Sequence, residues 1–229
     1  MTRTYGRWLG AWAQLGIGLF GYALAVRLMI ASRLGLGPWD SFHVGLSGLT
    51  GMSIGMANIV CGLLIVAASW WIAIRPGIGT LANMVGISIF LDLLQPLVPA
   101  APSWSWALGY HVVGILLCGL TTGVYIGAGL GKGPRDGLMV GLSNRTGWPV
   151  RRVRTLIEIV VLACGWLMGG TIGLGTIMFA FGIGPAVQWG LRLCGVLDGP
   201  RGERTREQAD KSTREQRSRG ELKTLNSKL

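Results

Sequence analysis

The chain has 229 residues, half of them apolar, with 38 glycines and only 14% charged residues. Its mean hydropathy of +0.49 is typical of membrane proteins rather than soluble domains. The formal net charge is +11, but the basic residues lie between apolar blocks and in the C-terminal tail, which favours a membrane surface over nucleic acid. The four cysteines lie singly in apolar runs, so no disulfide, metal site or redox centre is predicted.

Apolar blocks long enough to cross a bilayer occur six times along the chain, since a spanning helix needs roughly 20 residues. The first block is too long for a signal-peptide core, and we expect it to be retained. Tryptophans cluster near the block ends, as interfacial anchors do. The blocks cover about 8–31, 54–74, 78–97, 106–129, 155–171 and 173–195.

Lysine and arginine are distributed unevenly between the connecting segments. With the N-terminus inside, the external segments contain only Arg33, whereas the internal ones are rich in arginine. The positive-inside rule therefore predicts a multi-pass protein of the bacterial plasma membrane with both termini cytoplasmic. We expect residues 1–199 to form the membrane domain and the basic segment 200–229 to be a disordered cytoplasmic tail.

A short motif occurs twice, as "GLGPWD" at 35–40 and "GKGPRD" at 131–136, and ten of the 17 positions in 35–51 recur 96 residues later. The same offset pairs "GIGTL" at 77–81 with "GLGTI" at 173–177. This indicates a duplication, with repeat one at about 8–97 and repeat two at about 106–195. Because each repeat has an odd number of spans, we predict an all-α polytopic membrane protein whose six transmembrane helices form two inverted three-helix repeats.

The two GxGPxD segments are too short to span and too apolar for a solvated loop, which favours a re-entrant or interfacial position. Glycine followed by proline predicts the start of a short helix, whose N-terminal end attracts anions. Asp40 and Asp136 then have two interpretations: each caps its own first turn, or each binds a proton, a cation or a cationic solute. The candidate binding residues of these segments are Asp40, Asp136, Gly35, Gly37, Pro38, Gly131, Gly133 and Pro134.

Charged residues also occur within the predicted spans. Arg27 and Asp92 are expected at the same depth, where they would pair for stability or act in gating or substrate binding. Glu158 follows Arg154 by four residues, a spacing that places both side chains on one helix face and favours a neutral pair over a role of Glu158 in transport. His43 and His111 are interpreted as interfacial packing residues or proton sensors.

The sequences "GLGPWDSFHVGLSGLTGMSIG" at 35–55 and "PGIGTLANM" at 76–84, with their echoes in the second half, resemble the YczE-like bacterial integral membrane proteins of the YczE/YyaS/YitT grouping. The resemblance covers roughly residues 8–195. It implies a multi-spanning plasma-membrane protein of a kind often supposed to transport, and it supplies no catalytic or binding residues.

Motifs of enzyme chemistry are absent from the sequence: there is no HExxH, no Walker-type loop and no zinc spacing. We therefore expect no catalytic activity, no metal and no cofactor. The leading hypothesis is a small secondary transporter or exporter, driven by protons or ions, and the alternative is a non-transporting scaffold or accessory protein. The expected partners are the lipid bilayer and a small solute of unknown identity, a homodimer is compatible with the short spans, and nucleic acid is not expected.

Overall fold

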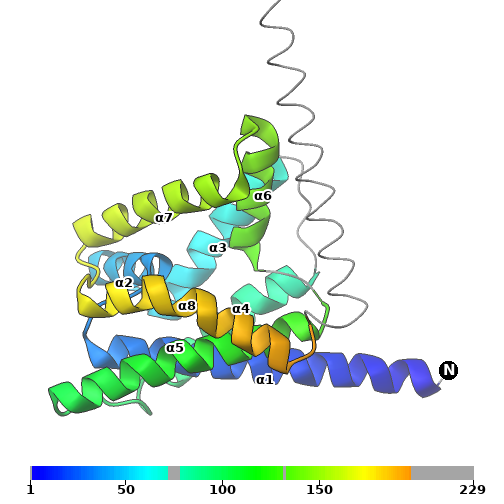
Figure 1. The fold of residues 1–229 in the computed structure, drawn as a ribbon, viewed down its shortest axis with the longest axis horizontal. Coiled ribbons are helices and arrows are strands. Elements are labelled where there is room, and N and C mark those ends of the chain that lie inside the picture. The colour runs from blue at the N-terminus through cyan, green and yellow to red at the C-terminus, as the bar shows by residue number, and fades with distance from the viewer. Residues whose placement is uncertain (1, 72–77, 131–132, 197–229) are drawn as a thin grey trace, which may run out of the picture.

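The computed structural model describes residues 2–71, 78–130 and 133–196, without the side chains of 2–7, 69–71, 78, 134, 136, 137 and 140. Gly131, the side chains of Pro134 and Asp136, and the predicted tail at 200–229 therefore lie outside the described residues. The described part is helical throughout (Figure 1), with α1 (Thr2–Ser32), α2 (Pro38–Thr50), α3 (Ile54–Trp71), α4 (Ile78–Leu93), α5 (Trp104–Gly127), α6 (Pro134–Thr146), α7 (Val150–Leu167) and α8 (Leu174–Leu193).

The helices follow the sequence duplication. α2 and α6, α3 and α7, and α4 and α8 each begin at positions 96 residues apart. The short helices α2 and α6 begin at the prolines of the two GxGPxD segments, which confirms the predicted helix starts. The backbone plan of the first half therefore recurs in the second.

Both short helices also end in the same way. The glycine after each is left-handed, with φ of 74° at Gly51 and 72° at Gly147, a conformation that favours glycine. The hydroxyl of Ser47 donates to the carbonyl of Met52 at 2.7 Å. Ser143 makes the equivalent bond to Trp148 at 2.6 Å. These side-chain bonds fix the sharp turn that follows each short helix.

The long helices pack closely because small residues stand at their crossings. α1 and α5 run antiparallel, since Gly18 faces Tyr125, Gly21 faces Thr121 and Met29 faces Gly114. A Cβ atom added at these glycines would meet the opposite helix at less than 3 Å. The α1–α5 crossing is therefore a joint between the two repeats that tolerates no larger side chain.

One further helix of each half, α4 or α8, packs against the α1–α5 crossing in the same way. α4 packs on α1 with Gly86 against Leu19, and α8 packs on α5 with Gly182 against Ile115. The two pairs are the same contact shifted by 96 residues. Each half thus packs its first and last long helices side by side and parallel.

The short helices cross over to the opposite repeat. α2 packs on α7 and α6 packs on α3. The loop before α2 pairs with the loop before α8, because the Leu36 amide donates to the Thr171 carbonyl at 3.1 Å and the Gly175 amide to the Leu34 carbonyl at 2.7 Å. Gly35 allows this approach, with a φ of 114° and with Gly173 directly against it.

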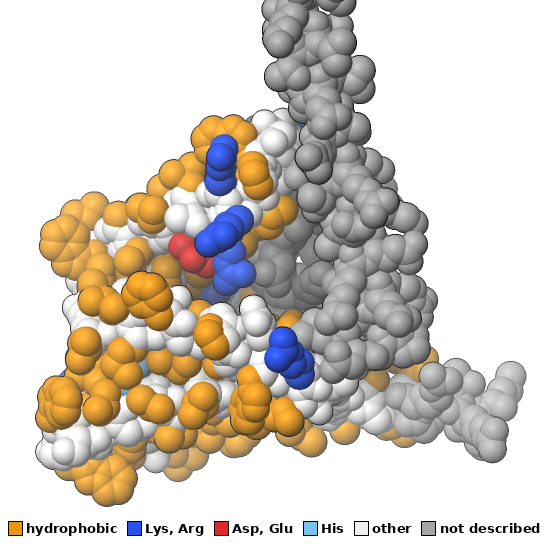
Figure 2. All heavy atoms as spheres, in the orientation of Figure 1, with side chains coloured by type: hydrophobic (Ala, Val, Ile, Leu, Met, Phe, Trp, Pro, Cys, Tyr) orange, Lys and Arg blue, Asp and Glu red, His pale blue; other side chains and the backbone are white. Residues whose placement is uncertain are grey.

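The outer surface is apolar, as expected for helices facing lipid (Figure 2). Leu167 and Phe181 are 79% and 80% exposed. Three described helices, α1, α5 and α8, are long and apolar enough to cross a membrane, and α2 with α3, bent by 112°, makes up to a fourth span. The structure thus shows a helical membrane protein with fewer qualifying spans than the six predicted, because α4 has only 16 residues and α7 begins with Arg151, Arg152 and Arg154.

The close packing of α5 on α8 gives a test of the fold. A Cβ at Gly119 would overlap the backbone of Ala186, so Gly119→Val should force the helices apart and destabilise the protein by about 1–3 kcal/mol. The melting temperature of the purified protein should fall by roughly 2–10 °C. The control is Gly109→Val on the same helix, where nothing lies within 4 Å of the added atom. Equal melting temperatures for the two variants would contradict the close crossing.

Candidate functional site: a central cavity between the repeats

A cavity of about 540 Å³ lies in the middle of the described structure, and every one of the eight described helices contributes to its lining. The N-terminal ends of α2 and α6 both open into it, through Gly37 and Pro38 on one side and Gly133 on the other. On the face shown in Figure 2, basic and acidic side chains gather at a hollow between α7 and α8, whereas the surrounding surface is apolar. Charged and polar side chains from both repeats therefore meet at this cavity.

Much of the lining consists of pairs of positions 96 residues apart. Such pairs include Tyr22 with Cys118, Trp39 with Arg135, Asn58 with Arg154, Gly62 with Glu158 and Ile87 with Ile183. The two halves thus present the same backbone positions to one cavity. They differ in the polar side chains that these positions carry.

Arg135, in the first turn of α6, reaches across the cavity to the other repeat. Its guanidinium lies over the ring of Trp39 at 4.6 Å from the ring centre. It also donates to the amide oxygen of Asn58 at 3.2 Å. A cation held on an aromatic face and by one neutral acceptor keeps further N–H donors for another partner.

Asp40 lies in the first turn of α2 and lines the cavity with only 9% of its surface exposed. Its side chain makes no hydrogen bond or salt bridge with any residue that the structure describes, and α2 has no side-chain cap bond. The interpretation of Asp40 as a hydrogen-bonding cap is therefore not supported, although its charge still suits the helix N-terminus. His43, one turn further along, is 2% exposed and lines the same cavity.

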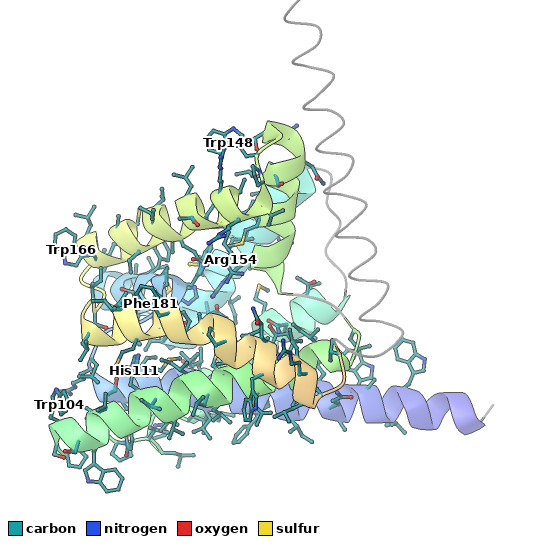
Figure 3. All side chains as sticks on the ribbon, in the orientation of Figure 1. Trp104, His111, Trp148, Arg154, Trp166 and Phe181 are labelled. Atoms are coloured by element: carbon teal, nitrogen blue, oxygen red, sulfur yellow. The ribbon has the colours of Figure 1, made fainter. Side chains whose placement is uncertain are left out.

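The pair of Arg154 and Glu158 forms as the four-residue spacing predicts. The Arg154 Nε donates to Glu158 Oε1 at 2.9 Å. Figure 3 shows the Arg154 side chain pointing from α7 toward the interior, and both residues line the cavity. Their charges neutralise each other within one helix.

Asn83 on α4 adds a hydrogen-bond donor without a partner. Its side chain is 6% exposed and lines the cavity, and its amide nitrogen has no hydrogen-bond partner in the described structure. Buried polar groups are almost always bonded, and an unpaired one at a cavity wall is available to a ligand.

Arg27 and Asp92 do not bond to each other. The Arg27 side chain donates to the carbonyl of Leu91 at 2.7 Å and to the amide oxygen of Gln95 at 2.6 Å, at the end of α4. Asp92 instead accepts from the Ser53 hydroxyl and the Gly55 amide at the start of α3. Neither residue lines the cavity, so both hold helix ends together.

His111 likewise lies apart from the cavity. It is fully buried, with one ring nitrogen 3.1 Å from the Ser32 hydroxyl and the other 2.9 Å from the Gly175 carbonyl. It thereby ties α1, α5 and α8 together. Its role here is structural.

The polar residues Trp39, Arg135 and Asn83 were not singled out by the sequence reasoning, which concentrated on positions identical in both repeats. Trp39 and Arg135 occupy equivalent places inside the repeated motif and differ. A comparison of the unequal positions within the repeat would have pointed to them. Asn83 has no such signal, because it lies outside the repeated motif and only the fold places it at the cavity.

Comparison with known proteins places the chain in a family. The family model described as "Family of unknown function (DUF6198)" matches residues 10–192. The uncharacterized membrane protein YczE of Bacillus subtilis is 39% identical over 186 residues, which cover 81% of this chain and 85% of that protein. An uncharacterized protein of Haemophilus influenzae is 33% identical over 193 residues, or 83% of this chain and 88% of that one.

The uncharacterized protein YyaS of Bacillus subtilis is 24% identical over 168 residues, which cover 71% of this chain and 83% of that protein. No solved structure matches. The family match over most of the chain and the identity to YczE agree with the helical, apolar architecture described above. The chain belongs to the DUF6198 family and is a YczE-like membrane protein.

Proposed function

We propose that the protein is a secondary transporter of a small solute and that the central cavity is its binding site. The observation that carries this proposal is the position of the cavity, at the joint of two repeats that both contribute equivalent residues. Secondary transporters built from inverted repeats bind their substrates at such a joint and expose it by moving one repeat against the other. A volume of about 540 Å³ suits a small molecule.

The inverted arrangement is part of the proposal. It is supported by the antiparallel packing of α1 on α5, which are the first helices of the two repeats. It is also supported by α2, which follows the C-terminal end of α1, and α6, which follows the C-terminal end of α5. With antiparallel long helices, the short ones belong to opposite ends of the bundle, and the arginine-rich α6–α7 segment belongs to the cytoplasmic end.

Small residues between α2 and α7 suit the movement that transport requires. A Cβ at Gly165 would lie against the backbone of Phe42, and one at Gly45 against the carbonyl of Gly165. Such contacts are mainly between backbones, so the helices slide without side chains interlocking. In this proposal α2 shifts along α7 when the cavity opens.

Single cysteines at equivalent sites test the inverted arrangement. Thr50 and Thr146 are exposed residues in the last turns of α2 and α6, and threonine to cysteine is a small change. In a background without the four native cysteines, Thr50→Cys should react with an impermeant maleimide on intact cells, and Thr146→Cys only after permeabilisation. Reaction of both from the same side in intact cells would rule out the inversion.

Filling the cavity tests transport itself. Ile183 lines the cavity, so Ile183→Trp should reduce solute flux into proteoliposomes at least about tenfold, because the larger side chain occupies the binding volume. The assay uses labelled solutes of four classes: organic cations, organic anions, zwitterionic amino acids and neutral sugars. The control is Ile177→Trp on the same helix, where the side chain is 57% exposed on the outer surface.

The expected result is saturable flux of one class in the wild type and in Ile177→Trp, and its loss in Ile183→Trp with normal membrane insertion. Wild-type protein that moves no solute of any class, although stably reconstituted, would refute transport. It would leave the scaffold hypothesis as the working model.

A further inference from the structure

We infer that the cavity takes a zwitterionic solute, one that carries both an ammonium group and a carboxylate, as amino acids do. Asp40 binds the ammonium group, and Arg135 with Asn83 binds the carboxylate. This inference rests on the proposed function and assigns the substrate class of the same site.

The first support is a pair of opposite charges that share the cavity without bonding to each other. Asp40 and Arg135 both line it, yet the salt bridge found in the described residues joins Arg154 and Glu158 instead. Their charges interact across the cavity, but neither side chain forms a salt bridge with a described residue. Such a separated pair of charges at a buried site is costly, unless a ligand brings an opposite charge into contact with each. A solute with one positive and one negative group satisfies both.

The second support is the chemistry of the wall that faces the carboxylate. Arg135 has N–H groups beyond the one that bonds Asn58, and the unpartnered Asn83 amide adds a neutral donor. The N-terminal end of α6, which opens to the cavity at Gly133, supplies a favourable dipole for an anion. These groups are all donors, so they select an acceptor such as a carboxylate.

The third support comes from the side of Asp40. Phe179 lies over the N-cap of α2, because a Cβ at Gly37 would meet its ring at 2.6 Å. Tyr22 and Tyr125 pack edge to face, with ring centres 6.1 Å apart, on the same lining. Aromatic walls around a carboxylate suit an ammonium group, since ring faces attract cations.

Charge balance distinguishes the zwitterion from singly charged solutes. The Arg154–Glu158 pair is already neutral, which leaves Asp40 and Arg135 as opposite charges in the described lining. An organic cation would compensate Asp40 and leave Arg135 without an anion, and an organic anion would do the reverse. Only the zwitterion compensates both at once.

The test compares matched solutes on the wild-type protein. Phenylalanine is set against phenethylamine, which lacks the carboxylate, and hydrocinnamate, which lacks the amino group; leucine, isopentylamine and isocaproate form a second set. At tenfold excess over its dissociation constant, a zwitterion should raise the melting temperature by roughly 3–6 °C. It should also compete for flux in proteoliposomes, and the amine and the acid should bind at least about thirtyfold more weakly.

Variants assign the two ends of the solute. Asp40→Asn should weaken phenylalanine binding roughly thirtyfold or more and leave hydrocinnamate binding unchanged. Arg135→Gln should weaken phenylalanine binding by a similar factor and leave phenethylamine binding unchanged. Asn83→Asp places a negative charge beside the solute carboxylate and should abolish phenylalanine binding while strengthening that of the amine. The control is Arg145→Gln, exposed on the same helix as Arg135 and away from the cavity.

The wild-type comparison needs no variant, so a variant that fails to fold does not decide the result. If the amine or the acid binds as tightly as the zwitterion, or if flux is found for another class only, the inference is wrong and transport still stands. If no class shows flux, the proposed function itself fails, and zwitterion-dependent stabilisation alone would show a binding site without transport.

Discussion

The antiparallel crossing of α1 and α5 is the contact on which the rest of the structure depends. It brings the first helices of the two repeats so close that Gly18, Gly21 and Gly114 leave no space for a Cβ. Because α4 packs on α1 and α8 packs on α5 through equivalent contacts, this one crossing sets the position of all four helices. The short helices pack on α7 and α3 of the opposite repeat, and their N-terminal ends open into the same cavity.

The two repeats share a backbone and differ in chemistry. The positions that fix chain direction are the same in both, such as the glycines that end α2 and α6 and the serines that bond the following turn. Positions that reach the cavity are often unequal, with tryptophan at 39 and arginine at 135. A repeated backbone thus encloses a cavity whose two sides carry different side chains.

Local sequence signals predicted the parts of the fold that local physics decides. A glycine followed by proline fixed where both short helices begin, and a four-residue spacing predicted the Arg154–Glu158 pair. The partners of Arg27 and Asp92 were not predictable, because a shared depth does not determine which helix end each side chain meets. Asn83 gave no signal for the same reason: its exposure to the cavity depends on how α4 packs, and not on its neighbours in sequence. The predicted number of spans exceeds the number of qualifying helices in part because charge enters an apolar block at the start of α7.

The contact between Trp39 and Arg135 joins equivalent positions of the two halves. If the protein is a carrier as proposed, its two halves exchange conformations between the two end states of transport. A pair of identical residues at equivalent positions then contributes the same energy to both states and cancels from the energy difference between them. The energy difference then comes from the unequal pairs, which at the cavity include Trp39 with Arg135, Asn58 with Arg154 and Gly62 with Glu158. In the proposed transport cycle, these unequal pairs would therefore bias the side of the membrane on which the empty carrier rests.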